Sequence, residues 1–305
     1  MLEIVVRTEN AERHVRVSNE ELAVLVRRIG GDGDRFLVVH RIPDLPDVFA
    51  QVWHESGGDQ TLEYRDGAAD RHFQVMVDGV EAVIEALTGW ARQGSGWSTD
   101  LVWSLLDMGP TLDVPALDLG EDELKALEKR VREALVGCFV DRAELAELAE
   151  EYLVSADRRP VSREQALALA DRMWLVRVAE QAEWQGETDP ERLTRAFTAL
   201  QEAGITAREN FTCCRSCGQS EIGGEVGTDA RGLVYFHSHC TDSAAVGHGL
   251  MLRYGGFDGS SETTSAIGHE VFAALEATGL QADWDRDPNR AITVTPLDCR
   301  RRLLG

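Results

Sequence analysis

The stretch Phe211-Thr-Cys-Cys-Arg-Ser-Cys-Gly218, together with Tyr235-Phe-His-Ser-His-Cys240 further along the chain, decides how the C-terminal half of the protein is built. Cys214 and Cys217 have the Cys-x-x-Cys spacing that lets two thiolates converge on one ion. Thiolates followed by imidazoles are typical ligands of a tetrahedral zinc ion, so the stretch predicts a zinc site. The candidate ligands for its four positions are Cys213, Cys214, Cys217, His237, His239 and Cys240.

The second part of the stretch predicts a strand over residues 232–239. Side chains alternate between the two faces of a strand, so His237 and His239 would point the same way and complete a site with two thiolates. Cys240 would then lie on the opposite face, unless the strand ends there. The spacing equally allows a ligand set of Cys213, Cys217, His237 and one further thiolate, so the choice of ligands stays open.

Three other interpretations of the cysteines stand beside structural zinc. They could be small buried residues, a redox pair formed by Cys214 and Cys217, or ligands of a catalytic zinc with one open position. A redox pair is favoured by a helix start that lowers a thiol pKa, but the glycine-containing residues 218–224 predict no long helix. A zinc deaminase needs His-x-Glu before its paired cysteines, and no such motif precedes them here.

Hydrophobic periodicity on both sides of this stretch predicts a helical block that leads into a small sheet with helices on one face. Capping-box residues begin a helix at Ser162, and Pro190 lies in the first turn of the next. Helices are expected over 121–140, 141–153, from 162 and over 187–203, and then over 264–278. Strands are expected over 205–208, 232–239 and 249–254, with a final hairpin over 280–284 and 290–296.

The first 108 residues predict a separate domain with an antiparallel sheet and helices. Alternating segments predict strands over 2–6, 14–17, 36–40, 48–53, 61–65 and 72–77. Ser18-Asn-Glu-Glu21 predicts a capped helix start, and residues 80–90 predict a second helix. Residues 109–120 hold two prolines and two glycines and predict a linker. The chain is therefore expected to be an α+β protein with domains at 1–108 and 121–305.

Charge and hydropathy restrict the partners and the location. The formal net charge is −22, from 53 acidic and 31 basic residues. Such a chain repels nucleic acid and anionic membranes, whereas a basic protein is an electrostatically favourable partner. The sequence has no run of about 18 apolar residues and no basic N-terminal flank before an apolar segment. We therefore expect a cytoplasmic protein.

Residues 121–302 resemble a bacterial domain family, common in actinomycetes, whose activity is uncharacterised. The resemblance rests on Trp174 with Glu180-Gln181, Thr188-Asp-Pro-Glu-Arg-Leu193, Asn210-Phe-Thr-Cys-Cys-Arg-Ser-Cys-Gly218 and Tyr235-Phe-His237. Relatives often carry Gln-Asp where this chain has His239-Cys240. The resemblance therefore implies a core ligand set of Cys213, Cys214, Cys217 and His237.

The N-terminal domain resembles small actinobacterial domains, some of which are similar to immunity proteins of toxin systems. The shared segments are Gln51-Val-Trp53, Leu62-Glu-Tyr-Arg-Asp-Gly67 and Leu87-Thr-Gly-Trp90. The hypothesis is a non-enzymatic protein-binding or regulatory protein, immunity-like, with structural zinc. The alternative is a thiol-redox or zinc-dependent enzyme. An exposed apolar patch on the N-terminal domain would favour the first, and a deep polar cleft with convergent titratable groups the second.

Overall fold

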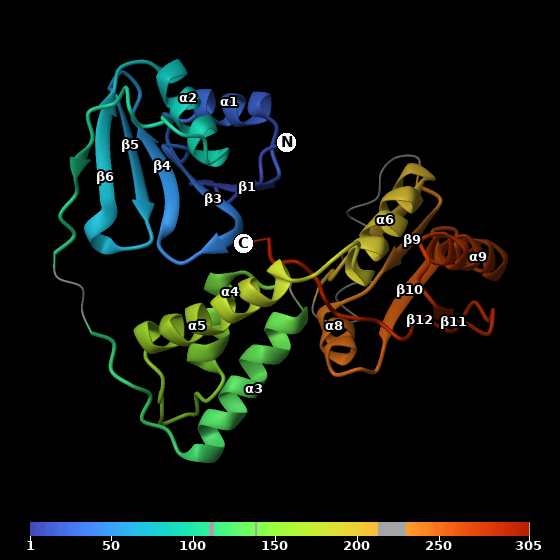
Figure 1. The fold of residues 1–305 in the computed structure, drawn as a ribbon. Helices are drawn as coiled ribbons and strands as arrows, with labels where there is room; N and C mark the ends of the chain where they lie inside the picture. Colours follow the sequence, from blue (N-terminus) through green and yellow to red (C-terminus); the bar gives the residue numbers. More distant parts are fainter. Residues whose placement is uncertain (110–112, 138, 213–229, 305) are drawn as a thin grey trace. The chain divides into compact units, whose positions relative to one another are not determined.

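The computed structural model describes residues 1–109, 113–137, 139–212 and 230–304. Its contacts divide the chain into two compact units (Figure 1). The N-terminal unit comprises Met1–Ala116 with Leu303 and Leu304, and the C-terminal unit comprises Leu117–Arg302. Both units combine helices with a sheet, so the predicted α+β class is confirmed.

The N-terminal unit is built on a seven-stranded antiparallel sheet with the order β2-β1-β3-β4-β5-β6-β7. Its strands are β1 (Ile4–Thr8), β2 (Arg13–Val15), β3 (Phe36–Leu45), β4 (Val48–His54), β5 (Gln60–Asp66), β6 (His72–Val77) and β7 (Ser104–Leu105). Helix α1 spans Asn19–Arg28, helix α2 spans Val80–Ala91, and a 3-10 turn covers Ala69–Arg71. Strands that follow each other in the chain mostly lie next to each other in the sheet, as expected for hairpin connections.

Helix α1 begins where the sequence predicts. The backbone N–H of Glu21 donates to the Ser18 hydroxyl at 3.1 Å, and the Ser18 N–H donates to the Glu21 carboxylate at 2.6 Å. This capping box satisfies two backbone donors that a helix start otherwise leaves unpaired. Both helices bury one face against the sheet, where Leu22 and Val26 of α1 meet Leu87 of α2 in one core.

The C-terminal unit starts with a helical block of α3 (Glu121–Gly137), α4 (Arg142–Glu151) and α5 (Arg163–Ala182). A five-stranded mixed sheet with the order β11-β12-β10-β9-β8 follows. Its strands are β8 (Ile205–Arg208), β9 (Gly232–Tyr235), β10 (Leu250–Gly256), β11 (Ala282–Asp283) and β12 (Ile292–Val294). Only the β8–β9 pair among these described strands is parallel. Helices α6 (Asp189–Glu202), α8 (Ser238–Ala245) and α9 (Ser261–Ala277) share one apolar core with the sheet (Figure 1).

The predicted strand over 232–239 is wrong in its second half. The strand ends at Tyr235, and helix α8 begins at Ser238. The alternation of apolar and polar residues suggested a longer strand, but burial decides the outcome. In a helix, Cys240 and Ala244 lie one turn apart on one face, and both are buried in the core of the sheet.

Candidate functional site

The junction between β9 and α8 holds three of the predicted zinc ligands. His237 is the N-cap residue of α8, and His239 and Cys240 lie in its first turn. Cys213, Cys214 and Cys217 lie outside the described residues. The idea that His237 and His239 share a strand face is therefore wrong, because neither residue belongs to a strand.

His237 and Cys240 form a close, buried pair. The Cys240 Sγ lies 3.5 Å from His237 Nδ1 and 3.6 Å from Nε2. The two residues are 8% and 5% exposed. His239 is exposed, and its ring centre lies 5.9 Å from that of His237. The helix start thus brings Cys240 to the imidazole and directs His239 outward.

The separation within this pair fits a tetrahedral metal. A thiolate at about 2.3 Å and an imidazole nitrogen at about 2.0–2.1 Å from zinc lie about 3.6 Å from each other at a tetrahedral angle. The observed 3.5 Å between Cys240 Sγ and His237 Nδ1 matches this value. The sulfur is also 3.6 Å from Nε2, so it faces the ring between its two nitrogens, and the imidazole would have to rotate to direct one nitrogen at a shared ion.

The electrostatic surroundings keep the pair neutral in the absence of a metal. Burial lowers the pKa of His237, and the nearby His239 and Arg253 lower it further. Burial raises the pKa of Cys240, although a backbone hydrogen bond at His237 and the Arg253 guanidinium act in the opposite direction. A neutral imidazole is the form that binds metal, and a bound cation would remove the thiol proton.

The chain enters the cysteine-rich segment beside this pair. The Phe211 N–H donates to the Phe236 carbonyl at 2.8 Å, and the Ser238 N–H donates to the Thr212 carbonyl at 3.2 Å. The Thr241 hydroxyl also donates to the Asn210 side-chain oxygen at 2.8 Å. Among the residues that the structure describes, no three His, Cys, Asp or Glu side chains are grouped closely enough to hold a metal. Cys138 and residues 213–229 lie outside the described residues.

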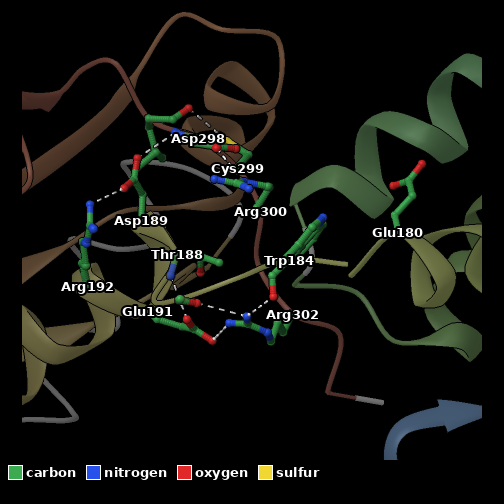
Figure 2. Close-up of polar contacts among 12 residues, drawn as sticks. Glu180, Trp184, Thr188, Asp189, Glu191, Arg192, Asp298, Cys299, Arg300 and Arg302 are labelled. Atoms are coloured by element: carbon green, nitrogen blue, oxygen red, sulfur yellow. Dashed lines mark hydrogen bonds and ion pairs between the residues drawn. The ribbon is translucent and has the colours of Figure 1, made fainter. Parts of the chain in front are cut away.

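A second polar cluster ties the C-terminal segment to the start of α6 (Figure 2). Arg302 forms an ion pair with Glu191 and donates to the carbonyls of Gly186 at 3.2 Å and Trp184 at 3.4 Å. The Asp298 N–H donates to the carboxylate of Asp189 at 3.0 Å. The carboxylates of this cluster are engaged in caps and ion pairs, which indicates a structural role.

The N-terminal unit exposes an apolar row on the face of its sheet opposite α1 and α2. The strand register places Phe36 beside Trp53, Trp53 beside Thr61, and Thr61 beside Met76. The Thr61 hydroxyl donates to the Met76 sulfur at 3.2 Å, which confirms that both face the same side. Phe36, Trp53 and Met76 are 37%, 40% and 55% exposed. We call these three residues the apolar strip.

Carboxylates surround the apolar strip. Glu55 follows β4, Asp59 precedes β5 and Asp78 follows β6, so each lies within two residues of the strip or of Thr61. All three are exposed, and within the described parts of the chain none of them forms an ion pair. Period-two alternation could have shown that Trp53 and Met76 point outward. The row itself depends on register across four strands, which local sequence does not reveal.

A buried polar network occupies the neighbouring rows of the same sheet face. Glu63 accepts a hydrogen bond from the Gln51 amide at 2.7 Å and contacts His72 Nε2 at 3.2 Å. His72 is only 4% exposed and its ring packs edge-on against Phe49 at 5.6 Å. These titratable groups are therefore enclosed and paired with each other.

Fold and site together define a two-unit α+β protein with a His–Cys pair at a helix start. A family described as a domain of unknown function, DUF6891, matches residues 120–303, which is more than half of the chain. The chain therefore belongs to the DUF6891 family. No curated protein matches it, and no solved structure does either. In the described ranges, every helix is too short or too polar to cross a membrane.

Proposed function

We propose that the chain is a cytoplasmic, non-enzymatic protein-binding or regulatory protein. The observation that supports binding is the apolar strip of the N-terminal unit, which exposes Phe36, Trp53 and Met76 in one row. Aromatic residues and Met are enriched where proteins bind each other, because aromatic rings bury a large area with few rotatable bonds and the flexible Met side chain adapts to the partner's surface. In this proposal residues 1–108 form the binding domain, 109–120 the linker and 121–305 the zinc-stabilised domain.

The partner that fits the strip is a basic protein. Glu55, Asp59 and Asp78 lie around the apolar residues and form no ion pair within 4 Å among the described residues, although Glu55 interacts at longer range with Arg35. Opposite charge at the rim of an interface accelerates association, and the apolar centre slows dissociation. A second copy of the chain is disfavoured, because two identical acidic rims would repel each other. An immunity-like role, in which an acidic protein neutralises a basic toxin, agrees with this chemistry.

Differential capture tests the binding role. Wild-type protein and a Trp53→Ala, Met76→Ala double variant are used as bait in lysate of the source organism. The control bait is Leu105→Ala, which removes an exposed apolar side chain from the same sheet outside the strip. We expect a basic protein that is retained by wild type and the control, lost with the double variant, and released by about 0.5 M salt because screening is then strong. An acidic partner, or retention by all three baits, would refute the proposal.

We further propose that the C-terminal unit holds one structural zinc ion. The donor separation in the His237–Cys240 pair and its position beside the entry to residues 213–229 support this. Two of the three cysteines Cys213, Cys214 and Cys217 would supply the remaining thiolates. A closed site would stabilise the β9–α8 junction, because binding free energy adds directly to folding free energy.

Elemental analysis of untagged protein, purified under reducing conditions, tests the zinc site. We expect about one zinc per chain and thiols that react only after chelation. Cys240→Ser should lose zinc, whereas Cys299→Ser, which changes the other described free cysteine, should keep it. Retention of zinc in Cys240→Ser would favour the ligand set Cys213, Cys214, Cys217 and His237. A metal-free protein with two fast-reacting thiols would instead favour the redox enzyme.

A further inference from the structure

Helices α3 and α5 line a cavity of about 330 Å³ within the C-terminal unit that is open to solvent on one side. Leu135 and Val136 of α3 and Met173 and Val176 of α5 form its apolar lining. Leu135 and Met173 are buried, but Val176 is 57% exposed at the cavity. The size and the apolar lining are typical of sites for small organic ligands, and exposed aliphatic groups gain from being covered.

Two ion pairs on the cavity wall are already satisfied. Arg172 donates to Glu128 at 2.8 Å, and Arg177 donates to Glu180 at 3.1 Å. Arg177 also stacks on the Trp184 ring at 4.5 Å and donates to the Cys299 carbonyl at 3.1 Å. These arginines therefore present little unbalanced charge to a ligand.

Arg132 is different from the other two arginines of the cavity. It lies on α3, three and four residues before Leu135 and Val136, and therefore on the same helix face. It is exposed, and no described residue forms an ion pair or hydrogen bond with its guanidinium. Acidic residues outnumber basic ones in this chain, which has a net charge of −22, so most arginines have carboxylates available to pair with. An arginine that lacks such a pair and lies beside an apolar cavity is therefore available to a bound anion.

We infer that this cavity binds a monoanionic amphiphile, with a carboxylate head on Arg132 and a hydrocarbon body against Leu135, Met173 and Val176. One unbalanced guanidinium favours a single negative charge, and its fork matches a carboxylate. A cationic ligand would be repelled by Arg132. A strongly polar ligand would leave the apolar lining uncovered and lose its own hydration without compensation.

Calorimetric titration of the full-length protein with octanoate and with 1-octanol separates the two parts of the site. We expect one octanoate per chain, bound more tightly than octanol. Arg132→Ala should weaken octanoate about tenfold and leave octanol unchanged, while Arg132→Lys should retain most of the octanoate affinity. Val176→Asp should weaken both ligands. Arg163→Ala, which removes a 72% exposed arginine of the same helix α5, is the matched control and should change neither.

The refuting outcomes are equally specific. Equal affinity for octanoate and octanol would show that Arg132 does not bind the carboxylate of the ligand. An unchanged octanoate affinity in both Arg132→Ala and Val176→Asp would place binding elsewhere on the molecule. Circular dichroism of each variant checks that the helices remain folded, so a loss of affinity can be assigned to the cavity.

Discussion

Replacing Arg302 by alanine should loosen the start of α6 measurably. The Arg302 side chain bridges the Glu191 carboxylate and the carbonyls of Trp184 and Gly186, so it joins the C-terminal segment to the segment between α5 and α6 (Figure 2). Arg300 is the matched control. It pairs with Asp298, only two residues away, and about half of each side chain is exposed.

The magnitude follows from exposure and geometry. The Arg302 and Glu191 side chains are 31% and 39% exposed, so solvent screening limits their pair to roughly 1 kcal/mol. The two carbonyl contacts, at 3.2 and 3.4 Å, are long for hydrogen bonds and together contribute about 1 kcal/mol. Arg302→Ala should therefore cost about 2 kcal/mol, and Arg300→Ala less than about 0.5 kcal/mol because its pair is exposed and local.

Hydrogen exchange of peptides covering residues 184–192 is the appropriate assay. The difference of about 1.5 kcal/mol corresponds to about tenfold faster exchange in Arg302→Ala than in Arg300→Ala, where local opening controls exchange. Equal exchange in the two variants would show that the bridge contributes nothing, and the reasoning from its three contacts would be refuted. Exchange that accelerates throughout the C-terminal unit would instead show that the segment supports the whole unit.

The pH dependence of this difference has a definite sign. Burial raises the pKa of Glu191, but hydrogen bonds from Arg302 and Thr188 outweigh it, so the pKa lies below the ordinary value of 4.5. A carboxyl group with a lowered pKa stabilises the folded state above its unfolded pKa, and this contribution is lost as the pH falls through the folded value. The difference between wild type and Arg302→Ala should therefore be constant near neutrality and shrink below about pH 4.5.

Three further predictions concern packing and charge. Gly232→Ala should lower the free energy of unfolding, measured in urea, by about 1–3 kcal/mol, because an added Cβ would lie 2.6 Å from the Ile267 side chain and 2.8 Å from the Gly255 carbonyl. Gly255→Ala is the control, because a Cβ there has no neighbour within 4 Å, and it should lower the free energy of unfolding by under about 1 kcal/mol. Trp90→Ala should cost about 3–5 kcal/mol, since this side chain is fully enclosed in the N-terminal core; a loss under 1 kcal/mol would contradict that packing. Acid titration followed by NMR should show that the pKa of Glu270 lies below its ordinary value of 4.5, because the Arg231 hydrogen bond lowers it, and Arg231→Ala should raise this pKa, since burial then acts alone.

Local signals predicted most of the fold. The capping boxes at Ser18 and Ser162 mark real helix starts, because a side chain that satisfies a backbone donor acts within four residues. The strand over 232–239 fails at its second half because the pattern of Phe236, His237 and Cys240 fits two periodicities. Only the burial of Cys240 against the sheet core selects the helix. Tertiary packing thus decides between helix and strand where the sequence pattern is too short to distinguish them.

The candidate site was only partly accessible to such reasoning. Spacing predicted candidate ligands, but the relation between His237 and Cys240 depends on the strand ending at Tyr235 and the helix beginning at Ser238. The apolar strip and the cavity were missed for a related reason. Each is made by side chains from several elements, and their adjacency is set by strand register or helix packing rather than by sequence distance.

The β9–α8 junction connects the proposed zinc site to the packing of the wider C-terminal unit. Phe236 directly precedes His237 and is fully buried, with its ring 5.6 Å from Phe139 and 5.9 Å from Phe197. Phe139 lies between α3 and α4, and Phe197 lies on α6, so one side chain contacts both the helical block and the sheet layer. A zinc ion bound at His237 would fix the backbone on one side of this aromatic contact. Because packed aromatic rings lose much of their contact energy when they separate slightly, fixing His237 would also restrain the end of α3 against the sheet.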